Sequence, residues 1–168
     1  MMKVIVDTNV PLVANGRADQ ASEDCVETCI DELMKITEGD VKLVLDDQRR
    51  IIEEYRNKLN PGGLPGVGDA FLKWAEINWA NPQQCDLVSI TPVDDLETDF
   101  QEFPTDPALA DFDPDDRKFI AVALAHSEKP PILQAVDSAW WTYRDALRQN
   151  GVTVDFICED DIRLILSS

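Results

Sequence analysis

The chain has 168 residues, 44% of them hydrophobic, which is the usual length of one domain and enough apolar material for one buried core. We therefore expect a single domain over residues 1–168. Fifteen basic residues against 33 acidic ones give a formal net charge of −18. Such a charge repels polyanions at long range, and it is the reverse of the basic surface typical of proteins that bind nucleic acid tightly.

Membrane and secretory classes are not indicated. No stretch approaches a membrane span, and Asp7 interrupts the amino-terminal segment before the apolar region of a signal peptide could form. We therefore expect a cytoplasmic protein. Cys25 and Cys29 lie four residues apart on an expected helix and the other two cysteines are isolated, so no zinc-type spacing is present. Reduced, partly buried thiols are expected rather than a disulfide or a metal role.

Strand-like and helix-like segments alternate along the chain. Short apolar runs predict strands at residues 3–6, 41–45, 87–90, 132–136 and 152–157. Helical spacing and stop signals predict helices at residues 10–14, 21–37, 48–59, 69–79, 113–125, 138–149 and 160–166. Residues 60–68 form a loop rich in proline and glycine, and residues 91–113 form a long acidic excursion of the kind that often overhangs a site. The alternation predicts a three-layer α/β/α fold with a central, mainly parallel sheet.

Three of the expected strands end in aspartate. Asp7 follows the first strand, Asp46 and Asp47 follow the second, and Asp137 follows the fourth. The carboxyl ends of parallel strands lie along one edge of the sheet, where open α/β folds bind their ligands, so these side chains can approach one another. Asp46 is most simply the N-cap of the helix that follows it, and helix capping is also the structural alternative for Asp7.

Asp116 adds a further acid at the start of the helix over residues 113–125. That helix is apolar nearly all round, and Ile120 and Ala123 follow Asp116 at helical spacing, so its carboxylate is expected to face inward. Carboxylates gathered at such an edge take up protons unless a cation lies among them. Oxygen ligands of this kind suit Mg²⁺ or Mn²⁺, and the chemistry they serve best is phosphodiester hydrolysis.

Four segments resemble, in order, the four acidic motifs of the PIN domain family. They are Val-Ile-Val-Asp-Thr-Asn at residues 4–9, Ile-Ile-Glu-Glu-Tyr-Arg-Asn-Lys-Leu at 51–59, Asp-Pro-Asp-Asp-Arg-Lys-Phe-Ile-Ala-Val-Ala at 113–123 and Val-Asp-Ser at 136–138. The resemblance covers residues 3 to about 141, and the first and third motifs are the more specific ones. It implies a compact PIN-like nuclease fold and Mg²⁺- or Mn²⁺-dependent endoribonuclease activity, as in toxins of type II toxin–antitoxin pairs.

The resemblance also implies roles for individual residues and partners. The metal-holding and catalytic residues would be Asp7, Glu54, Asp116 and Asp137. Thr8 and Asn9 would orient Asp7. RNA, single-stranded or structured, would be the substrate, an antitoxin protein would be a partner, and relatives of this kind often pair.

Spacing alone does not choose between neighbouring acids. Arg50, Glu54 and Lys58 lie four residues apart, so an exposed ion-pair ladder explains Glu54 equally well, and Glu53 is its alternative as a ligand. Asp116 also stands three residues after Asp113, as in a capping box, and Asp115 is then the alternative ligand.

Two features depart from the family pattern. Ala135 stands where many members carry Thr or Ser, and the acidic surface is unlike that of an RNA-binding toxin. Six basic residues on the two helices that carry Glu54 and Asp116 predict a local basic rim: Arg49, Arg50, Arg56, Lys58, Arg117 and Lys118. Trp141 shares its helix face with charged residues and is expected to be exposed, as a base-stacking or interface residue. The alternative function is a PIN-like metal- or protein-binding module with little catalysis.

Overall fold

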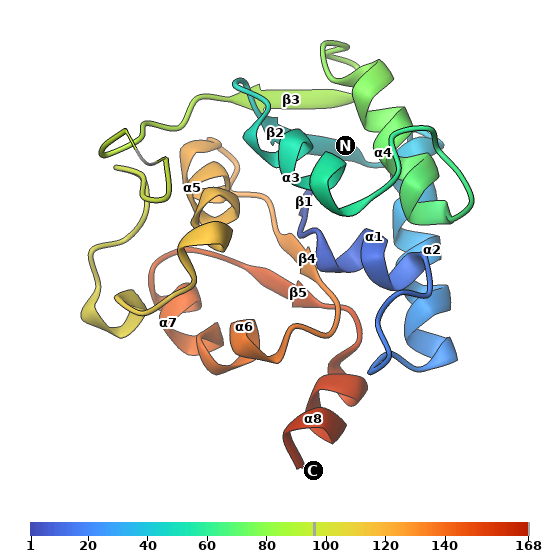
Figure 1. The fold of residues 1–168 in the computed structure, drawn as a ribbon. Helices are drawn as coiled ribbons and strands as arrows, with labels where there is room; N and C mark the ends of the chain where they lie inside the picture. The colour runs from blue at the N-terminus through green and yellow to red at the C-terminus, as the bar shows by residue number, and fades with distance from the viewer. Residues whose placement is uncertain (96, 168) are drawn as a thin grey trace.

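The structure is a computed structural model that describes residues 1–95 and 97–167 (Figure 1). Its strands are β1 (Lys3–Val6), β2 (Lys42–Asp46), β3 (Cys85–Val88), β4 (Ile132–Gln134) and β5 (Val154–Phe156). Its α-helices are α1 (Asn9–Ala14), α2 (Glu23–Thr37), α3 (Arg50–Lys58), α4 (Val67–Asn78), α5 (Arg117–Ala125), α6 (Ser138–Thr142), α7 (Arg144–Gln149) and α8 (Glu159–Ser167). Two 3₁₀ turns, η1 (Pro107–Leu109) and η2 (Pro114–Asp116), precede α5.

The strands form one parallel sheet in the order β3-β2-β1-β4-β5. β1 lies at the centre, where Val4 is opposite Leu43 of β2 and Ile5 is opposite Ile132 of β4. Helices α1, α2 and α4 pack together on one side of the sheet, and α5, α6 and α7 lie on the other (Figure 1). The predicted α/β/α class is confirmed. The chain leaves β1 first toward β2 and later returns to β4, so the strand order reverses beside β1 and opens a crevice at the carboxyl ends.

The first helix is held in place from both sides. Tyr55 of α3 is fully buried, and its hydroxyl donates a hydrogen bond of 2.5 Å to the carbonyl of Val6, the last residue of β1. On the other side, a Cβ on Gly68 of α4 would lie 2.1 Å from the carbonyl oxygen of Pro11 in α1. Only glycine allows α4 to approach α1 this closely, and together these contacts fix the β1–α1 turn that carries Asp7.

Several element boundaries differ from the sequence prediction. The expected helix over 138–149 is two helices, because Tyr143 leaves helical geometry (φ −96°, ψ 2°) between α6 and α7. The expected strand at 87–90 is β3 at Cys85–Val88, because pairing with β2 begins at Cys85 opposite Leu43. Asp113 caps a 3₁₀ turn, not the first turn of an α-helix, and α5 begins at Arg117.

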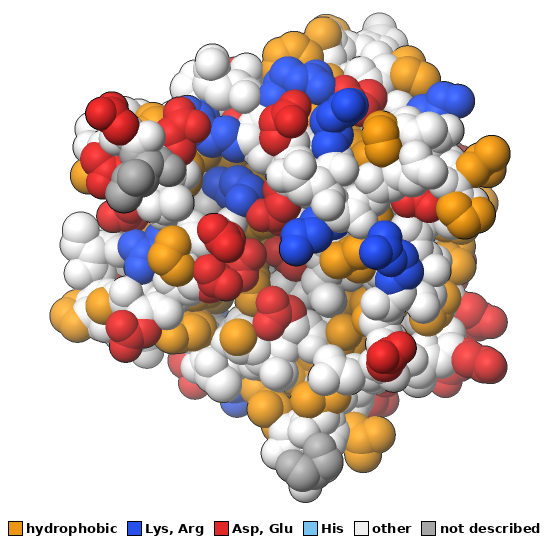
Figure 2. All heavy atoms as spheres, viewed as in Figure 1, with side chains coloured by type: hydrophobic (Ala, Val, Ile, Leu, Met, Phe, Trp, Pro, Cys, Tyr) orange, Lys and Arg blue, Asp and Glu red, His pale blue; other side chains and the backbone are white. Residues whose placement is uncertain are grey.

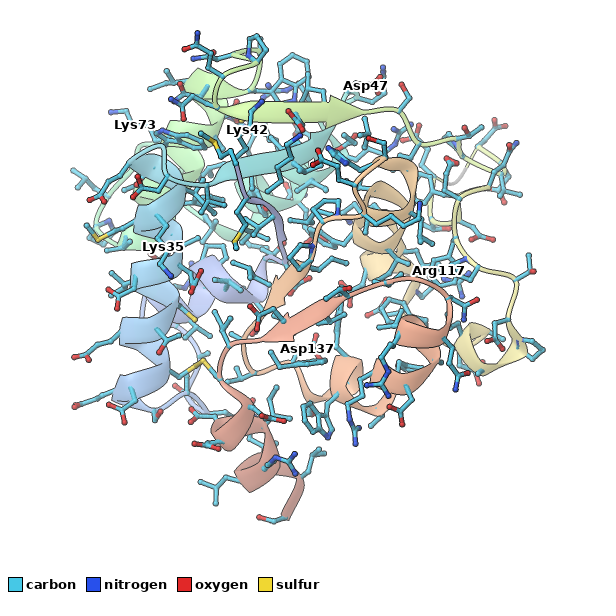
Figure 3. All side chains as sticks on the ribbon, turned by 180° about the vertical axis from the view of Figure 1, so that it is seen from behind. Lys35, Lys42, Asp47, Lys73, Arg117 and Asp137 are labelled. Atoms are coloured by element: carbon cyan, nitrogen blue, oxygen red, sulfur yellow. A yellow bond between two sulfur atoms is a disulfide. The ribbon has the colours of Figure 1, made fainter. Side chains whose placement is uncertain are left out.

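The prediction of reduced cysteines is wrong for two of them. Cys25 of α2 and Cys158, just before α8, form a disulfide with their Cα atoms 5.4 Å apart, visible as a yellow bond in Figure 3. The two residues are separated by 133 positions, so only the fold brings them together. Cys29 and Cys85 are buried free thiols.

The expectation of an exposed Trp141 is also wrong. The side chain is 9% exposed, its ring meets Phe156 edge-on at 5.0 Å, and the guanidinium groups of Arg144 and Arg163 lie 4.1 Å and 5.0 Å from it. Arg144, one of the charged residues that made this helix face look exposed, covers the ring together with Arg163 of α8. Trp141 is therefore a packing residue and is not free to stack on a base.

None of the helices in the described part of the chain is long and apolar enough to cross a membrane.

Candidate active site

The four acids singled out by the sequence line one cleft of about 530 Å³ at the carboxyl edge of the sheet. Asp7 follows β1, Glu54 lies in α3, Asp116 ends the turn before α5, and Asp137 begins α6. Thr8 and Asn9 line the same cleft. Residues from four separate segments thus meet where the strand order reverses, as the strand-end pattern predicts.

Asp7 lies deepest, with 4% of its surface exposed. Its carboxylate accepts a hydrogen bond of 3.0 Å from the backbone N–H of Asn9. Burial raises the pKa of Asp7 well above its usual range, and the nearby charges of Asp116 and Glu54 raise it further. A carboxylate in such a place is either protonated or balanced by a cation.

Glu54 is held by two partners. The Thr8 hydroxyl donates to one carboxylate oxygen, and the Lys118 ammonium lies 2.6 Å from the other. The ladder with Arg50 and Lys58 does not form, and Glu53 is exposed at the rim of the cleft. Glu54 is thus the acid that faces Asp7, while Thr8 supports Glu54 and not Asp7 directly.

Asp116 is half-buried beside the aromatic core, and Asp115 is exposed. The indole N–H of Trp140 donates to Asp116 at 3.1 Å, so the side chain turns into the cleft and does not complete a capping box. Burial raises the pKa of Asp116 to about 7, with the charges of Asp113, Glu54 and Asp137 adding to the shift. Trp140 partly counters this by its hydrogen bond.

Asp137 caps α6 by accepting from the N–H of Ala139 at 3.1 Å. Burial, together with the charge of Asp113, raises its pKa. The side chain of Asn9 accepts a hydrogen bond of 2.8 Å from the N–H of Val136 and so joins the end of β1 to the segment that presents Asp137. This link stands where a hydroxyl at Ala135 would have offered support.

The donor set fits a hard dication. The four acids of the cleft offer carboxylate oxygens, which Mg²⁺ and Mn²⁺ prefer. The raised pKa values of three of them indicate negative charge that is not balanced by a cation. Among the described residues, ligand atoms come within 4.8 Å of one another in threes at two other places, but not in this cleft. Lys118 supplies the positive charge that pairs with Glu54.

The expected basic rim is present but largely neutralised. Arg49 and Arg56 both pair with Glu76 of α4, and Arg117 pairs with Asp99 at 3.2 Å. Figure 2 shows Lys and Arg side chains interleaved with carboxylates over the face that carries α3. Internal pairing of this kind follows from the acidic composition, because acids outnumber bases by 33 to 15.

Arg50, another residue of the expected basic rim, lines the cleft. One of its terminal nitrogens pairs with Glu97 at 3.1 Å, and another lies 3.6 Å from Asp46, too far for a hydrogen bond. Its Nε and Nη1 are buried without a hydrogen-bond partner. The guanidinium is thus held between two acids, and it places a positive charge in the wall of the cleft. Spacing along α3 did not distinguish Arg50 from its neighbours.

Asp46 has the capping role that the sequence predicts. It is fully buried, and its carboxylate accepts from the N–H groups of Gln48, Arg50 and Ile51 at 3.2 Å, 2.9 Å and 2.9 Å. All of its hydrogen bonds close the β2–α3 turn, which leaves it no part in the cleft.

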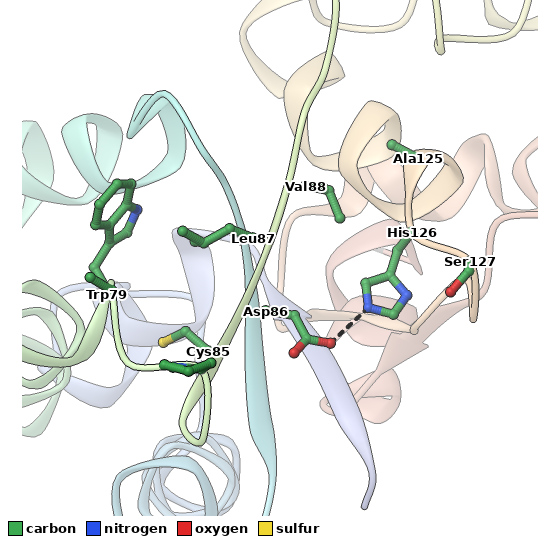
Figure 4. A pocket seen from close by; sticks show the side chains of 10 residues that line it. Trp79, Cys85, Asp86, Leu87, Val88, Ala125, His126 and Ser127 are labelled. Carbon is green, nitrogen blue, oxygen red and sulfur yellow. Dashed lines mark hydrogen bonds and ion pairs between the residues drawn. The ribbon is translucent and has the colours of Figure 1, made fainter.

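A second acidic group lies at the opposite, amino-terminal end of the sheet (Figure 4). Asp86 contacts His126 Nε2 at 2.9 Å, Lys3 at 3.0 Å and Lys42 at 2.9 Å, and Glu128 also pairs with Lys3. Asp86, His126 and Glu128 have possible metal-ligand atoms within 4.8 Å of one another. The two lysines, however, already supply the positive charge that a metal ion would bring. Hydrogen bonds from His126 and both lysines lower the pKa of Asp86, against the effect of its burial. It is a structural ion-pair network.

Replacing Asp86 by asparagine is expected to lower the free energy of unfolding by about 1–3 kcal/mol at neutral pH, because two half-buried ammonium groups lose their shared carboxylate. Urea unfolding of the two proteins measures the difference. Glu128→Gln is the matched control, since the Glu128 side chain is 58% exposed and its pair with Lys3 should contribute much less to stability. Equal effects of the two changes would contradict the assignment of Asp86 as the centre of the network.

Comparisons with protein-family models, with curated proteins and with solved structures gave no match to this chain.

Proposed function

We propose that the protein is a PIN-like, metal-dependent endoribonuclease that uses Mg²⁺ or Mn²⁺. The observation that carries the proposal is the meeting of Asp7, Glu54, Asp116 and Asp137 in one cleft, with raised carboxyl pKa values at three of them. Clustered, partly desolvated carboxylates at the carboxyl edge of a parallel sheet are suited to a hard dication and an anionic substrate.

The chain's own residues have separable tasks in this scheme. Asp7, Asp116 and Asp137 would hold the ion, and Glu54 would complete the site while Thr8 and Lys118 fix its orientation. When bound, the metal supplies an activated water and neutralises charge on the phosphate. Arg50, Lys58 and Lys118 are the basic residues that line the cleft, and they would attract the phosphate groups of the substrate.

The direct test is cleavage of a labelled single-stranded RNA and of a hairpin RNA by the purified protein at low ionic strength, with Mn²⁺, with Mg²⁺ and with EDTA. We expect internal cleavage that requires the dication and weakens steeply with added salt, because a protein of formal charge −18 binds RNA weakly. Activity that persists in EDTA would contradict the proposal.

Arg50→Gln is expected to weaken RNA binding about tenfold and to reduce the salt dependence by about one phosphate contact, without changing the Mn²⁺ requirement. The reason is that Arg50 lines the cleft and carries a positive charge there. Fluorescence anisotropy of a labelled RNA in Ca²⁺, measured across a salt series, gives both quantities. Arg49→Gln is the matched control: Arg49 pairs with Glu76 and covers Trp79, outside the cleft. A salt slope unchanged by Arg50→Gln would exclude the phosphate contact.

The alternative is a PIN-like module that binds metal or protein with little catalysis, favoured by the neutralised basic rim and the acidic surface. It predicts Mn²⁺ binding at the cleft without RNA cleavage, so the same assay separates the two functions. A role as the toxin of a toxin–antitoxin pair, with an antitoxin partner and pairing of two copies, is an expectation that comes from the family resemblance.

A further inference from the structure

Three cysteine sulfurs meet far from the acidic cleft, where α2 passes the end of β5 and the start of α8. Cys25 and Cys29 lie one turn apart on the buried face of α2, and Cys158 directly precedes α8. Their sulfur atoms all lie within 4.8 Å of one another. Cys25 and Cys158 are joined as a disulfide, and Cys29 is a free thiol beside them.

The third thiol is not placed to act as a nucleophile. Cys29 is fully buried, and burial raises its pKa to about 12, with the charges of Glu32 and Asp161 adding to the shift. At neutral pH it is a neutral thiol and exchanges slowly with the neighbouring disulfide. Its position next to two other sulfurs therefore calls for another explanation than catalysis of disulfide exchange.

Reduction changes what this cluster offers. A dithiol reductant gives two electrons and two protons to the Cys25–Cys158 bond and becomes a disulfide itself, which leaves three thiols in one place. Zn²⁺ binds thiolates at about 2.3 Å, so that neighbouring sulfurs in a tetrahedral site lie about 3.8 Å apart. The three sulfurs already lie within 4.8 Å of one another, close to this spacing.

We propose that the reduced protein binds a thiophilic metal ion, of which Zn²⁺ is the first candidate, through Cys25, Cys29 and Cys158. On binding, three sulfur–metal bonds form and three protons leave. A cleft of about 310 Å³ borders the cluster, and carboxylates at Asp24 and Asp161 line it. These charges attract a cation, and one carboxylate or a water fills the fourth position.

The same cluster would then tie α8 to α2 in both redox states. Ile162 is the buried residue of α8, and the carboxylate of Asp161 accepts from the N–H and hydroxyl of Ser22 at 2.6 Å and 3.0 Å. Ile165 also packs against the core, and a cross-link at Cys158 adds to these few contacts of α8. In an oxidising compartment the disulfide supplies it, and in a reducing one the metal does.

The experiment uses the full chain, reduced with a phosphine under anaerobic conditions and titrated with Co²⁺ as a spectroscopic substitute for Zn²⁺. We expect one equivalent to give thiolate-to-cobalt charge transfer in the near ultraviolet and tetrahedral visible bands, both abolished by Zn²⁺. The acidic cleft cannot produce thiolate bands, so the result is independent of the proposed nuclease function. The disulfide-bonded protein should show no such bands.

Cys29→Ser should lose the charge-transfer band and bind Zn²⁺ at least about 100-fold more weakly. Cys85→Ser is the matched control, because Cys85 is also a buried free thiol but lies in β3, outside the cluster. It should titrate like the unaltered protein. The proposal is overturned by a reduced protein without thiolate bands, by equal bands in Cys29→Ser, or by the same bands before reduction.

Discussion

Replacing Asp7 by asparagine is expected to lower kcat/KM for Mn²⁺-dependent RNA cleavage by about 1,000-fold or more. Asparagine keeps the shape of the side chain and can still accept from the N–H of Asn9, so the β1–α1 turn is preserved. What is lost is the most deeply buried negative charge of the cleft, and with it a direct ligand for the dication.

The same change should stabilise the metal-free protein. Burial raises the pKa of Asp7, which means that the ionised carboxylate opposes folding. A neutral amide removes that cost, and the melting temperature in EDTA should rise by a few degrees. Loss of activity together with a gain in metal-free stability is a combination that a damaged fold does not produce. Single-turnover cleavage and thermal unfolding measure the two effects.

Asp31→Asn is the matched control, because Asp31 is an exposed residue of α2 and its loss changes the net charge equally. It should leave both quantities nearly unchanged. A second pair decides between the acids that spacing left open: Asp116→Asn should resemble Asp7→Asn, and Asp115→Asn should cost less than about tenfold. Retention of activity in Asp7→Asn would rule out the cleft as a nuclease site.

The position of the cleft can be predicted from the sequence, because it follows from two patterns: acids after buried strands and an acid at the start of a buried helix. Buried parallel strands place their carboxyl ends together; Asp7 follows β1 directly, and Asp137 lies three residues after the end of β4. The apolar surround of α5 likewise predicts that Asp116 turns inward, as its contact with Trp140 shows. These inferences need only the local pattern and the general geometry of the sheet.

The contacts inside the cleft depend on packing that no local pattern records. Glu54 pairs with Lys118 because α3 packs against α5, whereas the i,i+4 rule would pair it with Arg50 or Lys58. Arg50 is drawn instead toward Glu97 of the long acidic segment. In both cases tertiary packing selects the partner, because several acids and bases are equally plausible partners from the sequence alone.

The disulfide shows the same limit more sharply. Cys25 and Cys158 are 133 residues apart, and nothing in their spacing distinguishes this pair from the others. The prediction that Trp141 is exposed fails for a different reason. Helical periodicity identifies its charged neighbours, but it does not show that Arg144 and Arg163 lie over its ring.

In EDTA the protein is expected to be most stable near pH 4 and to lose on the order of 2 kcal/mol of unfolding free energy as the pH rises from 5 to about 7.5. The pKa of Asp116 is raised from 3.8 to about 7 in the folded state, so between these values the folded protein binds a proton that the unfolded chain has released. Stability therefore falls as pH rises through this window and levels above it. Asp7 and Asp137, whose pKa values are also raised, act in the same direction.

Below about pH 4 the dependence of stability on pH reverses, and stability falls as the pH falls. Asp69 and Asp86 have lowered pKa values because of their hydrogen bonds, despite some burial, so the stability they contribute is lost as the pH falls through the folded-state pKa. A maximum on the acid side of neutrality distinguishes this protein from one whose carboxylates are all paired, which would be most stable nearer neutral pH.

Mn²⁺ should remove the decline in unfolding free energy above pH 5, because it binds the deprotonated carboxylates and takes the place of the protons. The Mn²⁺-induced rise in melting temperature should be small at pH 5 and grow to several degrees at pH 7.5; occupancy at 100 times Kd corresponds to about 2.7 kcal/mol. Thermal unfolding across pH, with EDTA and with millimolar Mn²⁺, measures both curves. An Mn²⁺ shift that is independent of pH, or that survives in Asp7→Asn combined with Asp116→Asn, would place the ion elsewhere. A shift that grows with pH and disappears in that double variant ties metal binding to the ionisation of this cleft, because Asp7 and Asp116, whose pKa values are both raised, lie among its acids.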